Sequence, residues 1–208
     1  MMKEIFVTVL VCIFFFSCSP GGNFEKVEIG NQIWMSENLS VTRFSNGDEI
    51  PEAKTVIDWM RACSKGQPAW CYPLNSPENN GKYGKLYNWF AVVDPRGIAP
   101  EGWHVSSDDE WRELTDNLGG EIFAAYKLRT TAEGAVQNSE TGFSGLPAGG
   151  RKGDGTYFSF GSKGYWWTSS PVNDEYAWIR QLDYIQCSMS SITFSKQSGL
   201  SVRCIKDK

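Results

Sequence analysis

The alternation of apolar and polar residues predicts short strands rather than long helices. Two alternating runs, 27–29 and 32–35, are joined by Gly30 and Asn31, a pair typical of a two-residue hairpin turn. From residue 143 onward, short apolar and aromatic runs are separated by Gly, Asn and Asp, which favours strands. We therefore expect an opening hairpin and strands near 165–169, 176–182, 192–194 and 200–205.

Residues 106–118 carry the signals of a short helix. Ser107 and Glu110 have the spacing of a capping box, and Gly119 and Gly120 follow the last apolar position. Asp108, Asp109 and Glu110 would complement the helix dipole, so capping is favoured over the alternative of a metal or acid–base site. A second short helix is predicted at 122–128, and one helical turn at 56–61 within the loop-rich stretch 43–80. The order of elements predicts an α+β fold.

The N-terminus resembles an export signal. An apolar run at 5–16 follows Lys3 and ends at Ser17 and Cys18, and it is too short to span a bilayer as a mature helix. This layout predicts a lipoprotein signal peptide at 1–17, lipidation of Cys18, a tether at 18–26 and one domain at 27–208. The alternatives are a plain secretory signal and an uncleaved N-terminal anchor.

Length, charge and composition narrow the class of protein. The chain has 208 residues, which favours one domain. Its net charge of −4 and its scattered Lys and Arg residues argue against a nucleic-acid partner. The abundance of aromatic residues and glycine is typical of strands and turns in a globular fold.

Four cysteines remain once Cys12 in the signal and the lipidated Cys18 are set aside. An even number in an oxidising compartment predicts disulfides. Of the three possible pairings, we favour the one that joins cysteines neighbouring along the chain. The functional alternative, a metal site or a reactive thiol, lacks a C-x-x-C spacing and has a single histidine to draw on. The favoured pairs are Cys63 with Cys71 and Cys187 with Cys204.

Few residues are suited to catalysis. His104 is the only imidazole, and we expect it to be a hydrogen-bonded core residue rather than a base. The glycine-rich stretch 145–155 lacks a phosphate-binding context, and its Arg151 and Lys152 are expected on a turn. The acidic stretches 46–49 and 173–175 are expected to form turns, and calcium binding is the less favoured alternative. No enzyme activity, metal or cofactor is expected.

A series of aromatic and glycine motifs resembles the Fibrobacter succinogenes major paralogous domain, a family found on exported bacterial proteins. The resemblance spans about 27–207 and is carried by many modest motifs in order. They include Trp34-Met35-x-Glu37-Asn38-Leu39, Tyr83-Gly84-x-Leu86-Tyr87-Asn88-Trp89, Pro100-x-Gly102-Trp103-His104-Val105, Asp108-x-Glu110-Trp111, Thr141-Gly142-Phe143-Ser144, Gly164-Tyr165-Trp166-Trp167-Thr168-Ser169, Ala177-Trp178-x-Arg180 and Gly199-x-Ser201-Val202-Arg203-Cys204.

The resemblance implies a C-type-lectin-like fold related to formylglycine-generating enzymes, with a mixed, mainly antiparallel sheet, two short helices and long loops. Family members carry a cysteine where this chain has Ala99. The resemblance therefore implies that Cys204 needs another partner, which supports Cys187. The tryptophans inside the motifs are expected chiefly in the core, although Trp166 and Trp167 must point to opposite faces of one strand. Those tryptophans are Trp34, Trp89, Trp103, Trp111, Trp166, Trp167 and Trp178.

The protein is expected to be a cell-envelope lipoprotein whose domain recognises a ligand. We expect the lipid to anchor it in the outer membrane, with display at the cell surface favoured over a periplasmic orientation. The lectin-like domain would bind a carbohydrate or an envelope protein without catalysis. The alternatives are an assembly component of surface appendages and, third, an enzyme related to formylglycine-generating enzymes. The candidate ligand-binding residues are aromatic side chains in or beside loops: Trp70, Tyr72, Tyr157, Phe158 and Tyr176.

Overall fold

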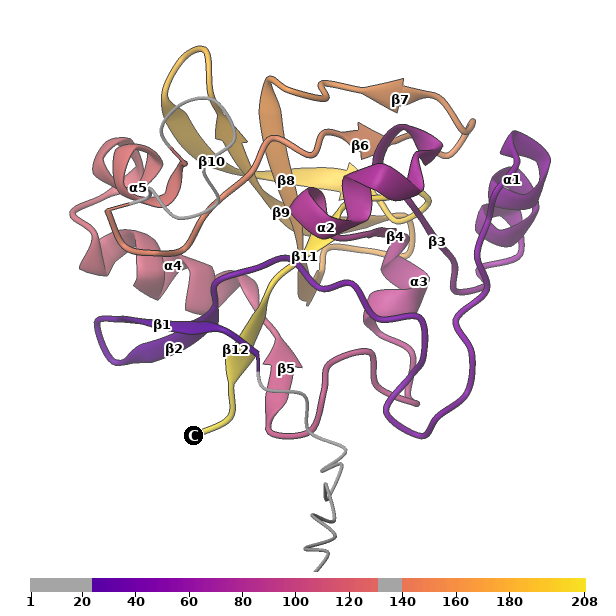
Figure 1. The fold of residues 1–208 in the computed structure, drawn as a ribbon, viewed down its shortest axis with the longest axis horizontal. Helices are drawn as coiled ribbons and strands as arrows, with labels where there is room; N and C mark the ends of the chain where they lie inside the picture. Colours follow the sequence, from indigo (N-terminus) through magenta and orange to yellow (C-terminus); the bar gives the residue numbers. More distant parts are fainter. Residues whose placement is uncertain (1–23, 131–139) are drawn as a thin grey trace, which may run out of the picture.

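The computed structural model describes residues 24–130 and 140–208 (Figure 1). The predicted signal peptide, Cys18 and most of the tether lie outside the described residues. The described chain is a mixed α/β fold with two four-stranded sheets, two small two-stranded sheets and a few short helices. Among the described residues, no helix is long and apolar enough to cross a membrane.

The first sheet joins the two ends of the domain. Its strands are β1 (Lys26–Ile29), β2 (Gln32–Met35), β12 (Cys204–Lys206) and β5 (Trp103–Val105), in the order β1-β2-β12-β5. The predicted hairpin is confirmed, because Ile29 lies opposite Gln32 and Gly30 has a φ of 63°. A Cβ on Gly30 would meet the side chain of Asn117 at 2.3 Å, so both conformation and space favour glycine.

The second sheet contains the long strands predicted for the second half of the chain. These are β8 (Lys163–Pro171), β9 (Tyr176–Asp183) and β10 (Ser188–Ser195), which form an antiparallel meander. The short strand β11 (Ser201–Val202) pairs in parallel with β8 at the other edge. The predictions at 165–169, 176–182 and 192–194 are therefore confirmed.

The helices outnumber the two that the resemblance implied. The structure contains α4 (Asp108–Asn117) and α5 (Glu121–Leu128) where helices were predicted, and it extends the predicted single turn into α1 (Val56–Ser64). A capping box between Thr55 and Asp58 starts α1, and Asn88 caps α3 (Trp89–Val92). The remaining elements are β3 (Trp70–Cys71), 3-10 turns at Pro73–Asn75 and Pro77–Asn79, α2 (Asn80–Tyr83), β4 (Leu86–Tyr87), β6 (Gly150–Arg151) and β7 (Tyr157–Phe158).

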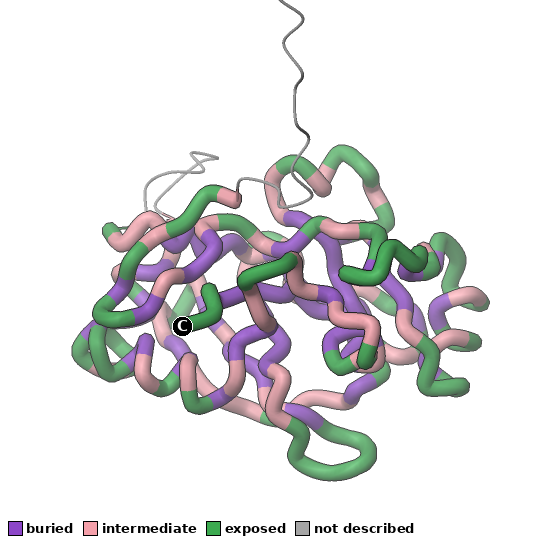
Figure 2. Tube along the Cα trace, turned by 90° about the horizontal axis from the view of Figure 1, so that it is seen from below, coloured by how far each residue is buried: buried purple, intermediate pink, exposed green. Residues whose placement is uncertain are grey.

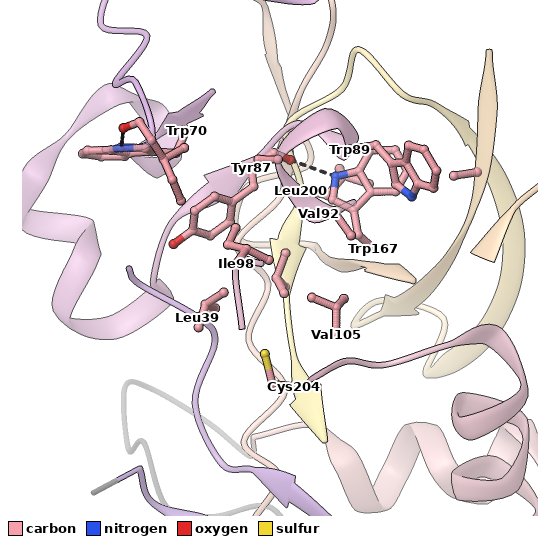
Figure 3. Close-up of a cluster of buried hydrophobic side chains, with 14 of the residues drawn as sticks. Leu39, Trp70, Tyr87, Trp89, Val92, Ile98, Val105, Trp167, Leu200 and Cys204 are labelled. Atoms are coloured by element: carbon pink, nitrogen blue, oxygen red, sulfur yellow. Dashed lines mark hydrogen bonds between the residues drawn. The ribbon is translucent and has the colours of Figure 1, made fainter. Parts of the chain in front are cut away.

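Strand β8 is buried on both faces. Trp166 packs with the cluster under α4 and α5, and Trp167 packs with the cluster around Tyr87. The indole nitrogen of Trp167 donates to the carbonyl oxygen of Tyr87 at 2.8 Å, the dashed line in Figure 3. Neither tryptophan is therefore on the surface, and buried segments run through the middle of the molecule (Figure 2).

The predicted strand at 200–205 is instead two strands, one in each large sheet. The chain passes from β11 to β12 at Arg203, whose side chain is fully buried. Its guanidinium donates to the carbonyl oxygens of Met35 and Phe143 at 2.9 and 2.6 Å and to Oδ1 of Asn38 at 2.7 Å. It also lies over the Phe143 ring. The break in the strand thus places a positively charged side chain where its hydrogen bonds link both sheets to the loops around Asn38 and Phe143.

Replacing Arg203 by methionine should lower the free energy of unfolding by about 3 kcal/mol, because buried carbonyl groups lose their donors. Urea unfolding of a soluble variant beginning at Phe24 measures the loss. Arg43→Met is the matched control, since Arg43 is exposed and its ion pair with Glu49 is at the surface, where such pairs contribute at most about 1 kcal/mol. Equal losses for both variants would contradict the structural role of Arg203.

Candidate functional site

A cavity of about 530 Å³ lies between α4, the start of α5 and the face of β9 and β10 that packs on these helices. This volume is within the range of about 300–1,000 Å³ typical of small-molecule sites. We call it the α4–β9 cavity. Its lining residues are Asp108, Arg112, Thr115, Asp116, Gly120, Glu121, Trp178, Arg180 and Ser191.

The alternation of β9 places the cavity's aromatic and basic side chains together. Ala177 and Ile179 point into the core cluster around Trp167. Because successive strand residues face opposite ways, Trp178 and Arg180 share the other face, which faces α4. The indole of Trp178 is only partly buried and forms part of the cavity wall.

The first turn of α4 fixes the polar wall of the cavity. Ser107 caps this helix, since its hydroxyl accepts from the backbone N–H of Glu110 and the Glu110 carboxylate accepts from the Ser107 N–H. The predicted capping box is therefore confirmed. It holds Asp108, the first residue of α4, where its backbone N–H donates to Oγ of Ser170 at 3.0 Å.

Asp108 and Arg180 form a buried ion pair. Nη2 of Arg180 donates to Oδ1 of Asp108 at 2.7 Å and to the Asp108 carbonyl oxygen at 2.9 Å. Ser191 donates to the same carboxylate oxygen at 3.1 Å, and Arg112 donates to the other at 3.2 Å. Burial lowers the pKa of Arg180, and the neighbouring Asp108 carboxylate opposes that shift. The pair is rigid, because three donors converge on one carboxylate.

Arg180 has donors that the described part of the chain leaves unused. Its side chain is 4% exposed, and Nε, which is shielded from solvent, has no partner there. Nη1 makes no hydrogen bond there either, since both hydrogen bonds of this guanidinium come from Nη2. A buried donor without a partner carries a free-energy cost. Because Nε is shielded, Nη1 is the donor left for a ligand.

The cavity offers a ligand three kinds of chemical group. The lining residues supply an aromatic wall, guanidinium donors and carboxylate acceptors, and none of them is His, Cys or Lys. Asp116 and Glu121, at the C-terminal end of α4 and the start of α5, are exposed, and neither forms an ion pair with another described residue. The site therefore combines fixed donors with accessible acceptors.

Sequence reasoning missed Trp178 as a surface residue. Of the seven motif tryptophans expected in the core, five are buried, whereas Trp103 and Trp178 are only partly buried. The available signal was the alternation itself, because an arginine two residues after Trp178 marks that strand face as polar. The same signal would have drawn attention to Arg180.

The predicted aromatic residues form packing contacts instead of an open stacking surface. Trp70 is 4% exposed and donates to the carbonyl oxygen of Ile50, so its expected exposure was wrong. Tyr72 packs edge-on against Trp70, with ring centroids 5.0 Å apart, and its carbonyl accepts from the Tyr157 hydroxyl. The structure thus brings three of the candidates together around the ammonium of Lys85 and the guanidinium of Arg151.

The other two predicted aromatics lie elsewhere. Phe158 is partly buried and stacks on Phe194 with ring centroids 5.7 Å apart. Tyr176 is 41% exposed at the start of β9, so it is accessible as expected, but it is not part of the α4–β9 cavity lining.

Arg151 was expected on a turn, and the structure corrects this expectation. The side chain is 1% exposed and donates to the carbonyl oxygens of Gly155 and Ala53 at 3.1 and 2.9 Å. Its guanidinium also lies over the rings of Trp59 and Tyr157. Arg151 therefore holds the glycine-rich loop against the segment that precedes α1.

Neither predicted disulfide is formed in the structure, where Cys63, Cys71, Cys187 and Cys204 are free thiols. Cys204 packs in the cluster around Tyr87 (Figure 3), whereas Cys187, in the turn between β9 and β10, packs against the cluster around Trp166. The substitution at Ala99 has therefore not produced the expected 187–204 pair.

Cys63 and Cys71, by contrast, belong to one small buried cluster with Trp59. The thiol of Cys63 donates to the Gln197 carbonyl oxygen at 3.0 Å. Burial raises the pKa of Cys63 to about 11 and that of Cys204 to about 12. These thiols are therefore protonated and poorly nucleophilic near neutral pH.

His104 is hydrogen-bonded as predicted, but it is not a core residue. Its side chain is 43% exposed and bridges two carboxylates, with Nε2 2.7 Å from Glu110 and Nδ1 2.6 Å from Asp207. It lines a second cavity of about 500 Å³ with Glu113 and Lys206. Burial lowers the pKa of His104, but the hydrogen bonds that the ring donates to the two carboxylates outweigh burial and raise the pKa overall. Both ring nitrogens are occupied, so this imidazole acts as a clamp between α4 and the C-terminal segment.

The acidic stretches considered for calcium are turns in the structure. Asn173 accepts from the backbone N–H groups of Glu175 and Tyr176, and Asn46 accepts from the N–H of Asp48. Across residues 24–130 and 140–208, no group of three or more His, Cys, Asp or Glu side chains is placed to hold a metal ion.

Comparison with known proteins identifies a family without adding a function. The family model described as Fibrobacter succinogenes major domain matches residues 27–206, which is most of the chain. No curated protein and no solved structure matches.

His104 should stabilise the fold in a pH-dependent way. A folded-state pKa above the unfolded value of about 6.5 gives a contribution that is present below pH 6.5 and is lost as pH rises through the raised pKa. His104→Gln should therefore cost more stability at pH 6 than at pH 9, by at most about 1 kcal/mol because the site is half-exposed. Urea unfolding of both proteins at the two pH values measures this. A larger loss of stability at pH 9 than at pH 6 would contradict the role of His104 as a clamp between α4 and the C-terminal segment.

Proposed function

We propose that this chain, which belongs to the Fibrobacter succinogenes major domain family, is a lipid-anchored cell-envelope protein with a non-catalytic domain that binds carbohydrate. The observation that carries the proposal is the α4–β9 cavity, where the partly exposed Trp178 lies beside the buried Asp108–Arg180 pair. The C-type-lectin-like fold implied by the family resemblance is compatible with the antiparallel sheets and short helices.

A sugar ring matches the two kinds of wall in this cavity. Its C–H face is apolar and packs on a flat indole, and its rim of hydroxyl groups forms hydrogen bonds. Arg180 is already oriented by Asp108, so little side-chain entropy is lost on binding. Trp178 would supply the apolar contact, and the surrounding polar groups would set the orientation of the ring.

The lipid anchor is part of the same proposal and rests on the sequence. The apolar run at 5–16, followed by Ser17 and Cys18, has the layout of a lipoprotein signal. Acylation of Cys18 would hold the domain at the outer membrane, and the tether at 18–26 would separate it from the lipid surface. We propose an outward orientation, because the family is associated with surface proteins.

A second candidate function is assembly with an envelope protein. The outer face of α5 exposes Ile122, Phe123 and Tyr126, which are 67, 59 and 53% exposed. Adjacent exposed apolar side chains of this size are typical of protein contact surfaces. This surface could serve an assembly component of surface appendages.

Trp178→Ala should abolish carbohydrate binding. We expect at least a tenfold loss of affinity, about 1.4 kcal/mol, because the apolar wall of the cavity is removed. A glycan array of plant, host and microbial sugars, followed by calorimetry on the hits, measures it. Tyr176→Ala is the matched control, since Tyr176 is an exposed aromatic on the same strand outside the lining. Failure of the wild-type domain on every glycan, with co-purification of a protein partner, would favour assembly instead.

Cys18→Ser should prevent lipidation and release the protein from the membrane fraction. The thiol is the acylated group, so serine removes the attachment point while changing little else. Palmitate labelling and membrane fractionation of the whole chain measure the effect, and Cys12→Ser is the matched control within the signal. Unchanged labelling and retention in Cys18→Ser would contradict the lipoprotein assignment.

A further inference from the structure

We infer that the α4–β9 cavity selects uncharged sugar units over uronic acids. This inference rests on the proposed function and names the class of ligand. It depends on three properties of the cavity: the balance of its charges, the presence of unpaired donors together with unpaired acceptors, and the single aromatic wall formed by Trp178.

The charges of the lining disfavour an anionic sugar. Three carboxylates, those of Asp108, Asp116 and Glu121, face two guanidinium groups, which leaves one net negative charge. The positive charge of Arg180 is already balanced by Asp108, 2.7 Å away. A uronate would therefore find no free cation in the wall except Arg112, which itself pairs with Asp108 and Asp109. It would also be repelled by Asp116 and Glu121.

The same charges do not oppose a cationic sugar. An ammonium group can pair with Asp116 or Glu121, and the hydroxyl groups beside it on the ring can accept from Arg180. Discrimination is therefore expected against anionic sugars.

A hydroxyl group satisfies both sides of the cavity. It donates one hydrogen bond and accepts two, so neighbouring hydroxyls of one ring can donate to the Asp116 and Glu121 carboxylates and accept from Arg180. Trp178 then packs against the apolar face of the ring. An uncharged polyhydroxylated ring is the small ligand class that uses the aromatic wall, the donors and the acceptors together.

Calorimetry with the full chain tests the inference. The protein is purified in a polyoxyethylene detergent, because sugar-based detergents would compete for the cavity. The probes are neutral oligosaccharides of glucose, mannose, galactose and xylose, uronate oligosaccharides of glucuronate and galacturonate, and deacetylated hexosamine oligosaccharides. We expect at least one neutral oligosaccharide to bind at least tenfold more tightly than every uronate oligosaccharide, with little change between 50 and 500 mM salt.

Variants separate the charge argument from the site itself. Asp116→Asn with Glu121→Gln removes the repulsion, so the discrimination against uronates should fall to about threefold or less. Neutral sugars should still bind, more weakly than to the wild type, because the amide oxygens of Asn and Gln accept hydrogen bonds from sugar hydroxyls. Glu101→Gln is the matched control, because Glu101 is exposed and lines a different cavity. Trp178→Ala should remove binding of every class.

The outcomes distinguish this inference from the proposed function. Preferred binding of a uronate that is lost in Trp178→Ala would retain the site and overturn the inference. Binding of neutral sugars that survives Trp178→Ala would place the ligand elsewhere and overturn it too. Absence of binding by all three classes would overturn the proposed function together with the inference.

Discussion

The fold depends on one buried cation, Arg203, at the point where the chain leaves one large sheet and enters the other. A guanidinium in the interior must replace all the hydrogen bonds it makes with water, and here three protein oxygen atoms do so at 2.6–2.9 Å. Burial lowers the pKa of Arg203 to about 9, which still leaves it charged at pH 7. The end of β2 at Met35 and the loops that contain Asn38 and Phe143 are therefore held by hydrogen bonds to this side chain, and with them the relative position of the two sheets.

Helix α4 holds the polar side chains of the candidate site in place. Its first turn is fixed on one side by Glu110, which both closes the capping box and accepts from His104, and on the other by Asp108, which holds Arg180. The helix thus lies between two cavities with different properties. In the cavity around His104 the imidazole is paired with Glu110 and Asp207, and Gln32 donates to Glu113. In the α4–β9 cavity, by contrast, the carboxylates of Asp116 and Glu121 are accessible.

The sequence predicted the features whose causes are local. The Gly30–Asn31 hairpin, the capping box of α4 and the strands of the β8–β10 meander each follow from neighbouring residues, and all three are present. The features that depend on distant partners were missed. Trp70 was expected beside an exposed loop and Trp178 in the core, but tertiary contacts bury Trp70 and leave Trp178 partly exposed. The break at Arg203 is another case, because its acceptors lie 60 to 168 residues away along the chain. Cysteine parity likewise could not show that Cys187 and Cys204 pack in separate clusters.

The contrast between Arg203 and Arg180 explains why we propose a ligand at one and not at the other. Both guanidinium groups are buried and both follow an aromatic or apolar residue on a strand, so composition alone does not separate them. Arg203 donates from Nε, Nη1 and Nη2 to protein oxygens, and its hydrogen-bonding requirement is met within the fold. Arg180 donates only from Nη2 in the part of the chain that the structure describes, and it lines a cavity beside an accessible indole. A rigid cation with unused donors next to an apolar wall is costly to maintain unless a partner completes it, and a ring that carries hydroxyl groups is the partner whose chemistry matches.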